Sequence, residues 1–343
     1  TKPNVPIVLC KGKFEGEQFC CKLNGTEKPL TPDTKSPEDD VAVTQRNFDK
    51  QNYTSEDTTE PTESDEDNDT KTAKSLSCGA QRPIINVRIF TGEDELTAVD
   101  GEFPWIVAIF KKKESSESYT FHCSGSLIHP KVIMTANHCV NRKRPGVLKV
   151  ILNGKTTLSR IGRNPEEERN VNEIIEHSGY YAGGLYNDVA LLVLNEPYVS
   201  YKQNHVNSLC LPSSNTSLEG IRCLVAGWGK DGRDDTTKIM KKVELPYINF
   251  NRCQDLIRKK MGDHFNLHKS FMCAGGEKGK DACKGDGGSP LMCAFPFENR
   301  FFQIGIVSWG IGCGEENVPG VYGNVQEFAE WIKSELRSRD IEL

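Results

Sequence analysis

Three fragments of the sequence hold the residue types that acyl transfer by a serine hydrolase requires: a base, an acid and a glycine-rich turn. His138 is followed directly by Cys139, whose covalent bond would hold the histidine in place. Asp188 stands at the head of an apolar run, where its carboxylate would be buried and would need a partner. The turn at 285–290 is of the kind that directs backbone N–H groups at a forming oxyanion. Each fragment alone is more often structural, so the prediction depends on all three occurring together.

The chain after residue 77 has the pattern of an all-β domain that could position these groups. Short apolar runs are separated by Gly, Pro and Asn turns, and alternating strand and helix signals are absent, which disfavours a parallel α/β sheet. These runs lie at 105–110, 132–135, 188–194, 223–228 and 303–309. The chain ends in apolar side chains at helical spacing, which predict a C-terminal amphipathic helix. They are Phe328, Trp331, Ile332 and Leu336.

Together, the three fragments resemble the trypsin/chymotrypsin family, and the resemblance covers residues 78–343. Further segments match it at 101–105, 226–229, 305–310 and 319–322. The resemblance implies two antiparallel six-stranded β-barrels with the C-terminal helix docked on them. It also implies five disulfides, which use every cysteine after residue 77: Cys78–Cys210, Cys123–Cys139, Cys223–Cys293, Cys253–Cys273 and Cys283–Cys313.

The sequence departs from the family at the nucleophile. The family turn reads Gly-Asp-Ser-Gly-Gly-Pro, whereas Gly287 stands here at the serine position and a serine follows two residues later, at Ser289. Two residues along an irregular turn move a side chain several ångströms, and attack needs hydrogen-bond reach to His138, about 2.6–3.2 Å. We therefore predict an inactive serine protease homologue, with an active endopeptidase that uses Ser289 as the alternative.

The resemblance implies that other parts of the machinery are retained. Gly285 and Gly287 match the positions that supply N–H groups to the oxyanion. Asp281 matches the acid that trypsin-like members use for Arg or Lys side chains, and Gly310 and Gly320 match the small residues that leave that pocket open. Two interpretations remain: a binding cleft for a basic side chain, or an inherited pocket that a loop fills.

The segment Arg88-Ile89 lies where trypsin-like zymogens are cut. In such zymogens the new N-terminal amine pairs with the acid before the nucleophile, which is Asp286 here. The resemblance therefore predicts that cleavage reshapes the domain without creating an enzyme. The alternative is that Arg88 is an ordinary surface residue.

The N-terminal part of the chain differs in composition from the rest. Residues 1–23 contain Cys10, Cys20 and Cys21, and an adjacent pair can hardly bond to itself without strain. Residues 24–77 form an acidic segment whose part from 33 to 69 holds thirteen acids against three bases, which is typical of a flexible linker. A short tether with the cleavage segment (78–88) and the protease-like domain (89–343) complete the predicted organisation.

This arrangement resembles the arthropod clip-domain serine proteases, and the absent serine places the chain among their serine protease homologues. Clip domains normally hold six cysteines, whereas three stand here, so the clip-like module is either truncated or degenerate. The resemblance implies a cofactor for proteases that activate prophenoloxidase, which promotes melanisation. A decoy that suppresses the same cascade is the alternative. Clip-domain proteases, prophenoloxidase and an upstream activating protease are the expected partners, with oligomers after cleavage left open.

Composition points to an extracellular protein. Thirteen cysteines without paired metal-type spacing indicate disulfides in an oxidising compartment, and the chain opens at Thr1 as a processed product does. A net charge of -5 argues against nucleic acid, and no apolar stretch approaches the roughly 20 residues that span a bilayer. We therefore expect a glycoprotein secreted into haemolymph or a fluid such as venom. Four sequons support this, at Asn24, Asn52, Asn68 and Asn215.

No cofactor is expected. Trypsin-like domains often hold calcium in the loop that falls here near residues 153–170, where Glu166, Glu167 and Glu168 are available. The flanking pattern does not match well, so no metal ligand is predicted.

Overall fold

The computed structural model describes residues 8–11, 18–21, 78–81, 96–114, 116–152, 167–198, 206–213, 215–229, 239–283, 285–295 and 298–343. The chain divides into two units, Thr1–Thr70 and Lys71–Leu343. In the first unit, β1 (Val8–Lys11) and β2 (Gln18–Cys21) pair as an antiparallel hairpin. The predicted boundaries of the clip-like module and the linker remain predictions.

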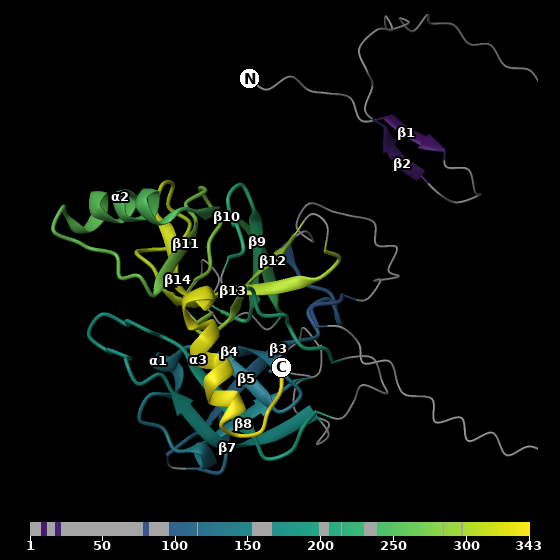
Figure 1. Ribbon diagram of the computed structural model, residues 1–343, viewed down its shortest axis with the longest axis vertical. Helices are drawn as coiled ribbons and strands as arrows, with labels where there is room; N and C mark the ends of the chain where they lie inside the picture. Colours follow the sequence, from purple (N-terminus) through teal and green to yellow (C-terminus); the bar gives the residue numbers. More distant parts are fainter. Residues whose placement is uncertain are drawn as a thin grey trace, which may run out of the picture. The chain divides into compact units, whose positions relative to one another are not determined.

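The second unit begins with a closed barrel of antiparallel strands (Figure 1). Its order is β3-β4-β5-β8-β7-β6, so each strand pairs on both sides and no edge is left open. The bounds are β3 (Ile106–Lys112), β4 (Tyr119–His129), β5 (Val132–Thr135), β6 (Leu148–Ile151), β7 (Glu168–Glu176) and β8 (Ala190–Leu194).

A second closed barrel follows with the order β10-β11-β14-β13-β12-β9. The bounds are β9 (Arg222–Gly227), β10 (Lys241–Ile248), β11 (Phe271–Gly275), β12 (Pro290–Ala294), β13 (Phe301–Trp309) and β14 (Pro319–Asn324). The predicted pair of six-stranded antiparallel barrels is therefore confirmed.

Among the described residues of this unit, helices are few: α1 (Asn137–Val140), α2 (Phe250–Met261), α3 (Val325–Arg337) and the 3₁₀ turn η2 (Pro145–Val147). The predicted C-terminal helix is α3, and its buried side chains recur at helical spacing. The helix follows β14 and packs on the first barrel, where the ring centroids of Trp331 and His177 are 4.9 Å apart. Just after the helix, Arg339 forms an ion pair with Glu173 at 2.6 Å. No helix among the described residues is long and apolar enough to cross a membrane.

Five disulfides reinforce this unit. They join Cys78–Cys210, Cys123–Cys139, Cys223–Cys293, Cys253–Cys273 and Cys283–Cys313, which are the pairs that the family resemblance implies. The pair Cys123–Cys139 ties β4 to α1, the short helix that carries His138.

The two barrels meet through buried polar contacts beside the turn at 285–290. Ser126 of β4 donates a hydrogen bond to Gln303 of β13, and both side chains are fully buried. The backbone N–H of Ser124 donates to the carbonyl of Gly287 at 3.0 Å. Gly288 has no room for a side chain, because a Cβ there would clash with the Ser124 carbonyl oxygen, and its φ is +81°.

Replacing Gly288 by alanine is expected to cost about 3 kcal/mol or more of unfolding free energy, because a left-handed φ and an unavoidable clash add together. Gly220→Ala is the matched control, since Gly220 has a φ of +75° with nothing within 4 Å of an added Cβ. The control is expected to lose about 1–2 kcal/mol. Guanidinium unfolding with disulfides intact measures both, and equal losses would contradict the close approach at Gly288.

Candidate functional site

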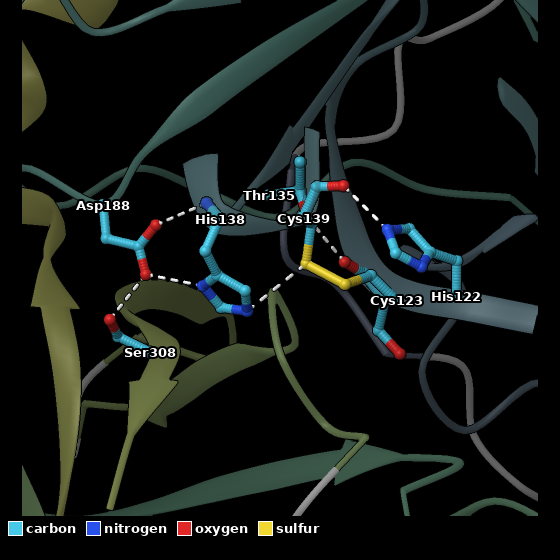
Figure 2. Close-up of a disulfide and its surroundings, with 8 residues drawn as sticks. His122, Cys123, Thr135, His138, Cys139, Asp188 and Ser308 are labelled. Atoms are coloured by element: carbon cyan, nitrogen blue, oxygen red, sulfur yellow. Dashed lines mark hydrogen bonds and ion pairs between the residues drawn. A yellow bond between two sulfur atoms is a disulfide. The ribbon is translucent and has the colours of Figure 1, made fainter. Parts of the chain in front are cut away.

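The predicted base and acid lie together between the barrels. His138 Nδ1 is 2.7 Å from Asp188 Oδ2, and the His138 backbone N–H donates to Oδ1 at 2.8 Å. Ser308 from β13 donates its hydroxyl to the same Oδ2 at 2.5 Å (Figure 2). Asp188 is fully buried, whereas the His138 side chain is 28% exposed. Three donors thus satisfy the buried carboxylate and fix the orientation of the imidazole ring.

The chain reaches Asp188 through a constrained turn. Asn187 has a φ of +54°, in the left-handed region that asparagine tolerates better than most residues. Its backbone N–H donates to the hydroxyl of Ser270 at 3.0 Å, and its side-chain amide donates to the Gly179 carbonyl at 2.7 Å. These contacts explain how an acid at the head of β8 points back at α1.

Gly287 faces His138, as the family alignment requires of the nucleophile position. A Cβ built on Gly287 would lie 2.7 Å from His138 Nε2 and 3.3 Å from Cε1. That separation is shorter than real Cβ contacts, so the imidazole partly occupies the space of the missing side chain. The base is present and oriented, but position 287 offers no atom that could attack a carbonyl.

Ser289 lies elsewhere in the turn. It is fully buried, and its hydroxyl has no hydrogen-bond partner among the described residues. A Cβ on Gly227 would be 2.8 Å from Ser289 Oγ and 2.7 Å from Asp286 Oδ1, which places this hydroxyl near Asp286 and β9. A hydroxyl buried there is closed to a substrate carbonyl, so the geometry opposes Ser289 as a displaced nucleophile.

Asp286 turns its carboxylate into the second barrel. It accepts the backbone N–H of Gly229 at 2.8 Å and that of Cys283 at 3.0 Å. Burial raises the pKa of Asp286 to about 6, and the two N–H donors offset part of this rise. No cationic side chain in the described ranges pairs with it. The predicted cleavage residues Arg88 and Ile89 lie outside the described residues.

A cavity of about 220 Å³ opens beside His138. Gly287, Gly310 and Gly320 line its wall together with the histidine. Asp281 lies behind this wall, because a Cβ on Gly320 would be 3.2 Å from Asp281 Oδ1. The carboxylate accepts N–H groups from Ala282 at 2.9 Å and Gly314 at 3.1 Å.

Burial raises the pKa of Asp281, and its two N–H donors oppose this rise. A bound guanidinium or ammonium would oppose this rise, since an opposite charge nearby favours ionisation. Asp281 itself is not among the residues that line the cavity, so the binding interpretation remains a prediction. Gly285 also lines this cavity, on the side where the resemblance places an oxyanion donor.

Two contacts of the site are not predicted by the sequence. Ser308 lies inside the matched segment 305–310, but only the fold brings its hydroxyl to Asp188. Asn137, where the family usually has alanine, donates its side-chain amide to the Val189 carbonyl at 3.3 Å, and its own oxygen has no partner among the described residues. Spacing alone gives no signal for either contact.

Metal ligation finds little support among the described residues. Cys123, His138 and Cys139 lie within 4.8 Å of one another, but the two cysteines are bonded to each other and carry no thiolate (Figure 2). Glu168 pairs with Lys149 at 2.7 Å. Glu166 lies outside the described residues, so the expectation of no metal remains a prediction.

Comparisons with known proteins agree with this geometry. The trypsin family model matches residues 94–332. Phenoloxidase-activating factor 2 of Galleria mellonella is 41% identical, over 80% of this chain and 93% of that protein. Inactive CLIP domain-containing serine protease A28 of Anopheles gambiae is 36% identical, over 81% of this chain and 73% of that protein. Phenoloxidase-activating factor 1 of Holotrichia diomphalia is 34% identical, over 76% of this chain and 72% of that protein. The chain therefore belongs to the trypsin family, among the clip-domain serine protease homologues.

The raised pKa of Asp286 predicts a pH-dependent stability. Folded Asp286 keeps its proton up to about pH 6, whereas an unfolded aspartate loses it near pH 4, so stability falls as the pH rises through this window. The stability of the uncut chain minus that of Asp286→Asn should therefore drop by about 2 kcal/mol between pH 4 and 7. Urea unfolding at a series of pH values measures this difference. A flat or rising difference would show that the carboxylate has a cationic partner.

Proposed function

We propose that this protein is a non-catalytic serine protease homologue that acts as a cofactor or adaptor in an extracellular proteolytic cascade. The observation that carries the proposal is Gly287, which faces His138 without a side chain. Loss of a serine nucleophile lowers kcat on the order of 10⁶-fold in a related system. What remains is an oriented imidazole beside an open pocket, which can bind a peptide chain but cannot form an acyl-enzyme.

The cleft supports binding of a basic peptide side chain. An Arg or Lys side chain in the cavity would lie beside Gly320, and a Cβ on Gly320 would be 3.2 Å from Asp281 Oδ1. The cation and the partly buried Asp281 carboxylate would stabilise each other, and the paired N–H groups of an arginine guanidinium would also fix its orientation. Because no nucleophile follows, the bound segment would be held and later released uncut.

The relatives support the choice of cascade. Two of the similar proteins are named phenoloxidase-activating factors, and another is named an inactive CLIP-domain serine protease. We infer that this chain contributes to prophenoloxidase activation and melanisation, with clip-domain proteases and prophenoloxidase as partners. An upstream protease would cut at Arg88-Ile89, and the new amine would pair with Asp286 and reshape the domain before assembly.

Secretion is part of the proposal. Five disulfides tie the described unit together, as suits an oxidising compartment. Asn215 is exposed, so its sequon is accessible to glycosylation. The other three sequons lie outside the described residues.

Cleaved wild-type protein is expected to leave an Arg-containing chromogenic peptide intact, and so is Ser289→Ala. The double variant Gly287→Ser with Ser289→Gly restores the family turn and should show measurable hydrolysis, once the His138 ring yields the space it now occupies. Initial rates on the chain cut at Arg88 measure all three proteins. Wild-type activity that disappears in Ser289→Ala would make this an active protease and end the proposal.

Adding the cleaved protein to insect haemolymph is expected to raise phenoloxidase activity and melanin formation. Asp281→Asn should lose most of this gain, because its pocket no longer attracts a basic side chain, whereas the exposed Asp255→Asn on α2 should keep it. A fall in melanin would support the decoy instead. No change with any of the three proteins would contradict both roles.

A further inference from the structure

A second hollow lies in the first barrel, with no residue in common with the cleft. It has a volume of about 760 Å³ and forms between the end of β3 with its following turn and the segment after α1. We call it the basic groove, after the six basic side chains that line it. These are Lys111, Lys112, Lys113, Arg142, Lys143 and Arg144.

Most of this positive charge is uncompensated. Two acids, Glu114 and Glu117, also line the groove, and Lys112 pairs with Glu117 at 2.7 Å. Among the described residues, none of the other five basic side chains has a carboxylate oxygen within 4 Å. With six basic and two acidic side chains, the lining of the groove has a clear excess of positive charge.

The basic side chains also crowd one another. The pKa of Lys143 is lowered, first by burial and then by the positive charge of Lys111, and the carboxylate of Glu176 opposes this. Arg142 is held with a φ of +58°, in a backbone region that a non-glycine residue adopts at a cost. An anionic occupant would relieve this repulsion and favour the charged form of Lys143.

The groove is anchored to the helix that carries His138. The Lys143 N–H donates to the Val140 carbonyl at 2.9 Å, and the Cys139 carbonyl is hydrogen-bonded to His122 Nε2 at 2.8 Å (Figure 2). Arg142 follows His138 by four positions, so their Cα atoms lie within about 15 Å of each other. One extended polypeptide could therefore reach both the cleft and the groove.

We propose that the basic groove binds an acidic polypeptide segment of a partner protein. The lining favours a polypeptide over a sulfated polysaccharide, because Glu114 would repel a uniformly anionic chain and Val147 offers an apolar contact. A peptide with spaced acidic residues matches both features. The inference does not depend on the role of the cleft, because its residues take no part in the chemistry at His138.

The test uses the full chain and two charge-reversal variants. The groove variant replaces Lys113, Arg142 and Arg144 by Glu, and the control variant does the same at three exposed basic residues near α2. These are Arg252, Lys259 and Lys269. Both variants change the net charge equally, and a third protein with Gln at the groove positions separates loss of charge from reversal.

Fluorescence anisotropy at physiological salt measures binding of a short labelled peptide in which glutamate alternates with alanine. Wild type and control variant should bind it, and the groove variant should bind at least about tenfold more weakly, with the Gln protein in between. The glutamine counterpart of the peptide should not bind. If the groove and control variants lost affinity for the peptide equally, binding would depend on the overall charge of the protein and not on the groove. If heparin bound in a groove-dependent way and the peptide did not bind, the groove would be a polysaccharide site. Equal loss in both variants, or binding of heparin alone, would overturn the proposal.

Discussion

The close approach of the two barrels at Gly288 decides how the rest of the site is arranged. The backbone there lies against the Ser124 carbonyl and the Thr135 hydroxyl, with no room for a Cβ. Because Gly288 is held in this place, the residues on either side of it, Gly287 and Ser289, point in different directions. Gly287 faces His138, and Ser289 turns toward Asp286 inside the second barrel. This difference in direction opposes Ser289 as a substitute for a nucleophile at position 287.

The fold itself gives a reason for the presence of Asp188 and His138, and this reason does not require catalysis. Asp188 is fully buried, and a buried carboxylate is tolerated only when donors surround it. The His138 ring, the His138 backbone and Ser308 supply those donors. Removing the histidine would leave an uncompensated charge, which typically costs 3–5 kcal/mol. The pair can thus outlast the nucleophile because the fold needs it.

Charge is distributed so that two neighbouring regions of the same unit suit ligands of opposite sign. The pocket beside His138 has Asp281 behind its wall and suits a cation, whereas the basic groove suits an anion. Both regions are formed partly by residues close to α1, whose position the disulfide Cys123–Cys139 secures. A binding protein gains specificity from such an arrangement, since a partner must present both charges at the right separation.

Sequence alone determined the family, the two-barrel fold and the loss of the serine, because these depend on local patterns and on the order of short motifs. Apolar runs bounded by turns marked the strands, and helical spacing of apolar side chains marked α3. The cysteine pairs followed from the resemblance and from no geometric argument. Tertiary structure alone decided where Ser289 points, that Ser308 completes the bonds to Asp188, and that a cavity lies beside His138. It also gathered six basic residues from two separate segments into one groove. These features arise from contacts between residues far apart in the chain, which spacing along the sequence does not encode.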